Sequence, residues 1–272
     1  MKLGRQDRAP TAARYRAGHD RSWGGGNRFM MLVCASVVKT GSTWWVQLAN
    51  EMLARHGGAE TEAVRRRWRL GRVIRGDEYR LGALRTHRLV AVLPAARFAP
   101  AFAVKTHASA TRAFDALRRL DLARSTLNVR DPRDIAVSAL EHAEQRRGNQ
   151  RAPLSGLETI DDAVDFVATQ ADVFGSWHDR HTTMVRYEDL VADPAREICR
   201  LGELMELDLD RAAAASVIEA VDRSTDAGDV RTKYNVGVAG RHQQVMTEVQ
   251  LRRANRILGP MIAAMGYPAG QL

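Results

Sequence analysis

The chain has 272 residues, of which 45% are hydrophobic and 27% charged, a composition typical of a globular protein with one large domain or two small ones. Its longest apolar runs, such as 29–38, are too short to span a bilayer, and the Arg-rich stretch 1–28 lacks the apolar core of a secretory signal. The two cysteines, Cys34 and Cys199, lie far apart in apolar patterns, so we expect buried thiols in a reducing compartment. We therefore predict a cytoplasmic protein in which 1–28 form a disordered basic arm and 29–272 form a single domain.

Positive charge is concentrated at the start of the chain. Residues 1–100 hold 19 Lys and Arg against 7 Asp and Glu, whereas residues 101–272 hold 22 against 25. This surplus predicts an anionic partner, namely a phosphorylated cofactor, an acidic substrate or nucleic acid. Residues 60–88 alone carry nine arginines and four acids, but only Trp68 and Tyr79 are interleaved among them. A nucleic-acid-binding module combines basic with aromatic side chains, so we expect no nucleic-acid partner.

Predicted strands and helices alternate along the rest of the chain. Apolar runs predict strands at 30–38, 101–107, 124–130 and 182–187. Periodicity and capping residues predict helices at 44–56, with Thr43 as its cap, at 111–120, from Asp131 onward, at 160–179, 195–206 and 210–222, and from Thr247 to Gly266. Residues 60–88 are predicted to be irregular. The alternation predicts an α/β fold, with a parallel sheet covered by helices on both faces and a ligand at the carboxyl ends of the strands.

The first strand runs into the sequence KTGSTWW at 39–45. Gly41 permits a tight turn, and the hydroxyls that follow it, the charge of Lys39 and the N-terminus of the next helix together favour an anion. A nucleoside-triphosphate loop would place its Lys after its second Gly, whereas Lys39 precedes Gly41. The loop is therefore predicted to hold a phosphate of another kind of ligand, with Trp44 placed to stack on a base. The alternative is an ordinary strand–turn–helix with a surface lysine.

Two further motifs end the second and third predicted strands. VKTH places Lys105 beside His107, a side chain suited to accept a proton near neutral pH, although most histidines in such positions are structural. VRDPRDIAVSAL places Arg130 at a strand end and Ser138 two turns into the following helix, which together form a clamp for a terminal phosphate. The alternative is that Arg130 pairs with a nearby acid, Asp131 or Asp134.

These motifs, in this order, resemble those of the cytosolic-type sulfotransferases, which use 3′-phosphoadenosine 5′-phosphosulfate (PAPS) and release PAP. KTGSTWW resembles the family's 5′-phosphosulfate loop, VKTH its strand with the catalytic histidine, and VRDPRDIAVSAL its 3′-phosphate segment. VRYEDL, at 185–190, resembles its Tyr-Glu-Asp-Leu segment. The resemblance extends over about 30–268 and implies a three-layer P-loop-type fold with a central parallel sheet flanked by helices.

The resemblance implies sulfuryl transfer to a hydroxyl or amine of an unidentified small or polymeric acceptor, without a metal ion and in a possible homodimer. His107 would be the general base, and Lys39 and Lys105 would stabilise negative charge on the bridging oxygen. The residues implied to bind the donor are Lys39, Thr40, Gly41, Ser42, Thr43, Trp44, Arg130, Ser138 and Tyr187. A small-molecule kinase on the same fold remains the alternative enzyme, and a nucleic-acid-binding module the alternative outside enzymes.

The chain departs from the family pattern in two places. Val38 stands where a proline usually precedes the loop lysine. The family's late Arg-Lys-Gly loop, which closes on the 3′-phosphate, appears here as 235–237, where only Gly237 matches, and His242 replaces a usual tryptophan. Neighbouring basic residues are placed to supply the missing charge. We therefore expect at least one residue of the following set to contact the 3′-phosphate: Arg231, Lys233 and Arg241.

Overall fold

The structure is a computed structural model that describes residues 30–76, 78–146, 154–180, 182–226 and 238–269. The predicted basic arm at 1–28 lies outside the described residues. No helix among those that are described is long and apolar enough to cross a membrane.

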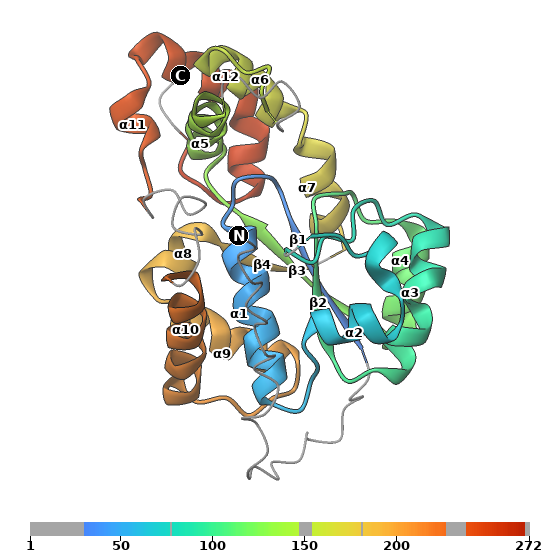
Figure 1. The fold of residues 1–272 in the computed structure, drawn as a ribbon. Coiled ribbons are helices and arrows are strands. Elements are labelled where there is room, and N and C mark those ends of the chain that lie inside the picture. The colour runs from blue at the N-terminus through green and yellow to red at the C-terminus, as the bar shows by residue number, and fades with distance from the viewer. Residues whose placement is uncertain (1–29, 77, 147–153, 181, 227–237, 270–272) are drawn as a thin grey trace, which may run out of the picture.

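Four parallel strands form the central sheet, in the order β2-β1-β3-β4 (Figure 1). Each predicted strand is present: β1 is Met31–Ser36, β2 is Phe102–Thr106, β3 is Ala123–Val129 and β4 is Thr183–Arg186. Cys34 on β1 is paired with Lys105 on β2 and with Thr126 on β3. The carboxyl ends of β1, β2 and β3 consequently lie side by side, and this brings the three predicted motifs together.

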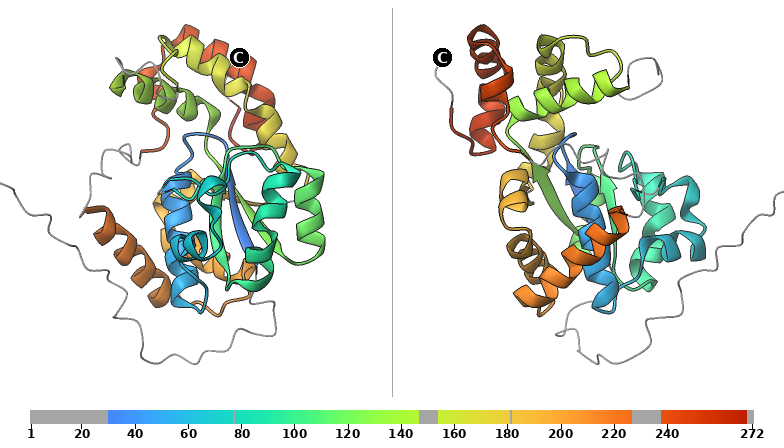
Figure 2. Two further views of the ribbon diagram at one scale, coloured as in Figure 1. Left: turned by 45° about the vertical axis from the view of Figure 1, so that its right-hand side comes forward. Right: turned by 60° about the vertical axis from the view of Figure 1, so that its left-hand side comes forward.

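Helices cover both faces of the sheet, as predicted for an α/β fold (Figures 1 and 2). On one face, α1 is anchored to the sheet through Trp45, whose buried indole N–H donates to the Thr126 hydroxyl at 2.9 Å. On the other face, the sheet packs against a second hydrophobic core, which includes Phe114 and Trp177. The helices of the first face are α1 (Ser42–Arg55), α9 (Pro194–Leu204) and α10 (Arg211–Asp226), and those of the second are α4 (Arg112–Arg119) and α7 (Ala171–His178), with α3 (Thr86–Phe98) outside them.

A group of helices stands above the carboxyl ends of the strands (Figure 1). It consists of α5 (Pro132–Gln145), α6 (Ile160–Ala168), α11 (His242–Val245) and α12 (Glu248–Ala264). The predicted capping box of the last helix is confirmed, because Thr247 and Gln250 cap each other's backbone N–H groups. The motif residues therefore lie between the sheet and this helical group.

Several predicted elements were wrong in detail. The stretch 60–88 is not irregular: it contains α2 (Thr61–Arg67), a 3₁₀ turn η1 (Leu70–Arg72) and the start of α3. The helix predicted at 160–179 is divided into α6 and α7, and β4 is followed at once by α8 (Tyr187–Ala192). Cys34 is buried as expected, but Cys199 is partly exposed.

Candidate active site

The turn after β1 is tight because two of its residues adopt left-handed backbone conformations, Lys39 with φ 62° and Gly41 with φ 73°. A Cβ atom on Gly41 would lie 2.9 Å from the ring of Tyr187, so only glycine allows the loop to pack there. Thr43 was predicted to cap α1, and this was wrong. Gly41 precedes the first residue of α1, Ser42, without any side-chain cap.

The hydroxyls of the loop have different roles. Thr40 is fully buried and its hydroxyl donates to the Val37 carbonyl at 2.9 Å, so its side chain shapes the turn. Ser42 is also buried, at the start of α1. The Thr43 hydroxyl instead accepts from the Lys105 ammonium at 2.7 Å, which ties the loop to β2. Trp44 is partly buried and packs against the core on the α1 face of the sheet.

His107 is held at the end of β2 by the neighbouring residue of β1. Its Nδ1 lies 3.1 Å from the carbonyl oxygen of Ser36 and 2.9 Å from the Ser36 hydroxyl. A carbonyl oxygen only accepts, so Nδ1 carries the proton and Nε2 keeps its lone pair. Burial, together with the charge of Lys105, lowers the pKa of His107 to about 4, so the imidazole is neutral near pH 7. His107 is therefore in the tautomer that a general base requires.

Ser36 is thus a positioning residue for His107, and its substitution provides a test. In Ser36→Ala the backbone carbonyl still accepts from Nδ1, so we expect kcat to fall only about 3–10-fold, the usual effect of one neutral hydrogen bond. PAP affinity should be unchanged, and Ser36→Thr should restore the rate. Steady-state kinetics and calorimetry measure both quantities. A loss of PAP affinity equal to the loss of rate would show that Ser36 supports the loop rather than the imidazole.

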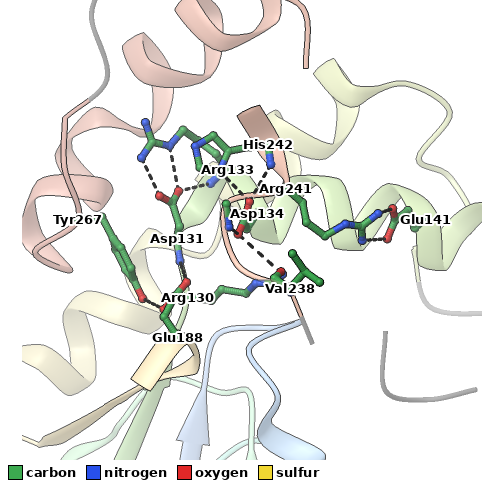
Figure 3. Close-up of polar contacts among 11 residues, drawn as sticks. Arg130, Asp131, Arg133, Asp134, Glu141, Glu188, Val238, Arg241, His242 and Tyr267 are labelled. Carbon is green, nitrogen blue, oxygen red and sulfur yellow. Dashed lines mark hydrogen bonds and ion pairs between the residues drawn. The ribbon is translucent and has the colours of Figure 1, made fainter. Parts of the chain in front are cut away.

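Arg130 leaves the end of β3 and is almost fully buried (Figure 3). Its guanidinium lies 4.2 Å from the centre of the Tyr187 ring and donates from Nη2 to the Val238 carbonyl at 3.1 Å. The alternative partner Asp134 lies 3.8 Å from the same nitrogen, at the limit of an ion pair. The Nε of Arg130 is buried and has no hydrogen-bond partner among the described residues, so Arg130 retains an unused donor. Ser138, on α5, is also buried.

Asp134 instead holds the segment that follows the late loop (Figure 3). One carboxylate oxygen accepts from the backbone N–H and Nδ1 of His242, at 2.9 and 2.7 Å, and the other accepts from the Gly240 N–H at 2.6 Å. Burial raises the pKa of Asp134, but these hydrogen bonds and the Arg130 charge hold it below the ordinary value. His242, where the family has tryptophan, is therefore a buried anchor of this segment to α5.

The expected substitute for the missing late-loop arginine is only partly visible. Arg231, Lys233 and Gly237 lie outside the described residues. The Arg241 guanidinium is paired with Glu141 on α5, with Nη1 donating to Oε2 at 2.7 Å (Figure 3). A phosphate contact from Arg241 would have to compete with that carboxylate, so its role stays a prediction.

Positive charge converges on the three strand ends. Burial lowers the pKa of Lys39 to about 8, and the charges of Arg130, Lys105 and Arg146 lower it in the same direction. His142 on α5 belongs to the same region, because burial and the charge of Lys39 lower its pKa to about 4. At neutral pH His142 is therefore uncharged, and the positive charge comes from the buried Lys105 and Arg130 and the partly buried Lys39, which together favour an anionic ligand. Among the described residues, no three His, Cys, Asp or Glu side chains converge in a way that could hold a metal ion.

The motif residues are therefore brought together, but the sequence did not point to four of their partners. Ser36 was predicted only as a strand residue, and nothing in the sequence indicated its contact with His107. Asp134 was considered only as a carboxylate that could pair with Arg130 in place of a phosphate. Glu78 fell in a stretch interpreted by its overall charge and Glu141 in the helix predicted from Asp131 onward, yet Glu78 contacts Lys105 and Glu141 contacts Arg241.

Comparison with known proteins agrees with this arrangement. The solved structures similar to this one include mouse sulfotransferase SULT7A1 complexed with PAP, which is 15% identical with a TM-score of 0.60 over 86% of this chain and 84% of that chain. Retinol dehydratase in complex with androsterone and inactive cofactor PAP is 17% identical, with a TM-score of 0.51 over 85% and 80% of the two chains. At these identities the likeness shows the fold alone. No curated protein matches the chain. The sulfotransferase domain model, however, matches residues 31–266, and the chain therefore belongs to the sulfotransferase domain family.

Proposed function

We propose that the protein transfers a sulfuryl group from PAPS to a hydroxyl or amine of an acceptor. One observation carries the proposal: His107, whose Nδ1 proton is held by Ser36, lies at the same edge of the sheet as Lys39, Lys105 and Arg130, which follow three different strands. Two anion sites suit a donor with a phosphosulfate at one end and a 3′-phosphate at the other. The unpartnered Nε of Arg130 supports the second site, because a buried donor without an acceptor fits a ligand's oxygen.

The roles of the residues follow from their positions. When bound, PAPS supplies the sulfuryl group. His107 takes the proton of the acceptor at Nε2, while Ser36 keeps the proton on Nδ1. Lys39 and Lys105 hold positive charge where negative charge grows on the bridging oxygen, in a buried setting that strengthens the interaction. Arg130, stacked on Tyr187, would bind the 3′-phosphate.

The donor site is tested by calorimetry in EDTA with PAP, 5′-AMP and ATP. PAP should bind more tightly than 5′-AMP by roughly 10–150-fold, because a charged hydrogen bond to a phosphate contributes about 1.5–3 kcal/mol. ATP, which lacks a 3′-phosphate, should bind much more weakly than PAP. Equal affinity for PAP and 5′-AMP would show that no 3′-phosphate site exists. Tight ATP binding that depends on Mg²⁺ would favour the kinase alternative.

The segment that pairs with β2 near His107 is rich in arginine, which favours an acceptor that carries negative charge. Residues 79–81 pair with β2 at Lys105, two residues before His107. The stretch 66–85, which includes these residues, carries exposed arginines. The following have no carboxylate within ion-pair distance among the described residues: Arg66, Arg67, Arg69, Arg72, Arg75, Arg80 and Arg85. A protein surface of this charge attracts anionic ligands.

A phenol series with a common nucleophile tests this preference. Transfer from labelled PAPS to 4-hydroxyphenylacetate should exceed transfer to 4-methylphenol and to tyramine, because only the first carries a negative charge. The advantage should shrink at high salt, since salt screens exposed charges. A preference for the neutral or cationic phenol would contradict an anionic acceptor and leave the donor site unaffected.

A further inference from the structure

Glu78 reaches the centre of the proposed donor site from the segment beside β2. Its Oε2 accepts from the Lys105 ammonium at 2.9 Å, and the same ammonium donates to the Thr43 hydroxyl at 2.7 Å. The residues that follow Glu78 are paired with β2, because the Lys105 N–H donates to the Tyr79 carbonyl at 3.0 Å and the Leu81 N–H donates to the Lys105 carbonyl at 2.8 Å. The position of the Glu78 carboxylate therefore follows from main-chain pairing with the strand that carries the catalytic lysine.

Glu78 acts on Lys105 and Thr43, which are both among the residues proposed to bind the phosphosulfate of the donor. A lysine ammonium has three N–H donors, and two of them are used by Glu78 and Thr43. Burial raises the pKa of Glu78, but the charge of Lys105 and hydrogen bonds from Lys105 and Thr43 hold it below the ordinary value, so the group is a carboxylate at neutral pH. An ionised carboxylate thus sits where the proposed function places the phosphosulfate of the donor.

The Glu78 carboxylate and the phosphosulfate of the donor would repel each other at Lys105, so the carboxylate has to leave when the donor binds. The Lys105 side chain is 4% exposed and enclosed, whereas the Glu78 side chain is 27% exposed. Glu78 can rotate toward solvent and toward the exposed Arg80, whose charge also acts on it. Lys105 has no such freedom, since it is held between β2 and the loop.

We propose that Glu78 is a residue of the donor site, whose carboxylate occupies the anion position at Lys105 and Thr43 until the donor displaces it. The inference rests on the proposed function. It assigns to Glu78 a competing role, in which the carboxylate keeps the buried lysine paired in the free protein and weakens donor binding by the cost of its removal. The opposite role, a fixed partner that keeps Lys105 charged and aligned, predicts the opposite effect on affinity.

Calorimetry of PAP binding to Glu78→Gln separates the two roles. Glutamine keeps the size and an oxygen acceptor for Lys105 but removes the charge. PAP should bind to Glu78→Gln roughly 5–30-fold more tightly than to the parent, as expected when a like charge several ångströms away is removed near a protein surface. The gain should be smaller at high salt. Glu78→Asp, which keeps the charge on a shorter side chain, should give little or none of this gain.

Glu62→Gln is the matched control. Glu62 lies on α2 and pairs with Arg65 at 2.8 Å, so its substitution removes one negative charge from the same part of the chain without touching the donor site. Its PAP affinity should stay within about twofold of the parent. If both glutamine variants bind more tightly to the same extent, the effect is one of net charge and the inference fails.

The remaining outcomes also decide the question. Unchanged or weaker PAP binding in Glu78→Gln, with unchanged thermal unfolding, would overturn the inference and make Glu78 a fixed partner of Lys105. If the parent itself fails to bind PAP in calorimetry, the donor site and the proposed function fall together with it. If the parent binds PAP and Glu78→Gln binds it more weakly, only the inference about Glu78 fails and the proposed function stands. The two failures are therefore distinguishable.

Discussion

Replacing His107 with alanine is expected to lower kcat by roughly 10²–10⁴-fold, the usual contribution of a positioned general base. The imidazole presents Nε2 as a proton acceptor, because the Ser36 carbonyl fixes the proton on Nδ1. PAP affinity should change little, since a neutral imidazole adds no charge to the donor site. Single-turnover kinetics with labelled PAPS and calorimetry with PAP measure the two quantities separately.

The pH dependence gives an independent check on His107. A base must be deprotonated, and the pKa of this imidazole is lowered to about 4, so the reactive form is present above that pH. We expect no acid limb near pH 6.5, the ordinary value for histidine, in the profile of kcat/KM. His107→Gln serves as the control, because its amide keeps the size and polarity but accepts no proton. Turnover in that variant equal to the parent's would reduce His107 to a structural residue.

The strand ends were predictable because their signals are local. An apolar run that stops at a charged or polar motif marks the end of a buried strand, and parallel strands bring such ends to one edge of the sheet. This reasoning placed Lys39, His107 and Arg130 together, and the structure has them at neighbouring strand ends. The capping box at Thr247 was equally local and was confirmed.

The partners of these residues were not predictable, because a local sequence signal says nothing about contacts between distant residues. Ser36 and His107 are 71 residues apart, and Glu78 and Lys105 are 27 apart, so their contacts depend on strand pairing and not on any nearby pattern. In α2, three consecutive arginines hid a short amphipathic helix whose buried positions, Thr61 and Val64, are one turn apart. Charge was weighed there above periodicity, and the helix was missed.

Tyr187 connects the two anion sites in a way that bears on their cooperation. One side of its ring packs against Gly41, and the guanidinium of Arg130 lies over the ring. The loop that is proposed to bind the phosphosulfate and the arginine that is proposed to bind the 3′-phosphate therefore share one aromatic surface. We expect a change at either site to affect the other through this ring, so the selectivity of a variant between ligands is more informative than its affinity for one.

Arg130→Ala is accordingly expected to weaken PAP binding by roughly 10–150-fold, since charged hydrogen bonds to a phosphate contribute about 1.5–3 kcal/mol. Binding of adenosine 5′-phosphosulfate, which has no 3′-phosphate, should change far less. The substitution leaves no carboxylate unpaired, because Asp134 keeps its hydrogen bonds from Gly240 and His242. Unfolding by heat should therefore stay cooperative, and its midpoint checks that the fold survives.

Arg130→Lys separates charge from geometry in the same measurement. Lysine keeps a positive charge but loses the planar fork that stacks on Tyr187 and reaches the Val238 carbonyl. We expect it to recover only part of the PAP affinity that alanine loses. If alanine weakens both ligands by the same factor, Arg130 acts through Tyr187 on the loop and not on a 3′-phosphate. The 3′-phosphate would then have to be held by Ser138 and the late loop, and PAP would keep its advantage over a ligand without a 3′-phosphate.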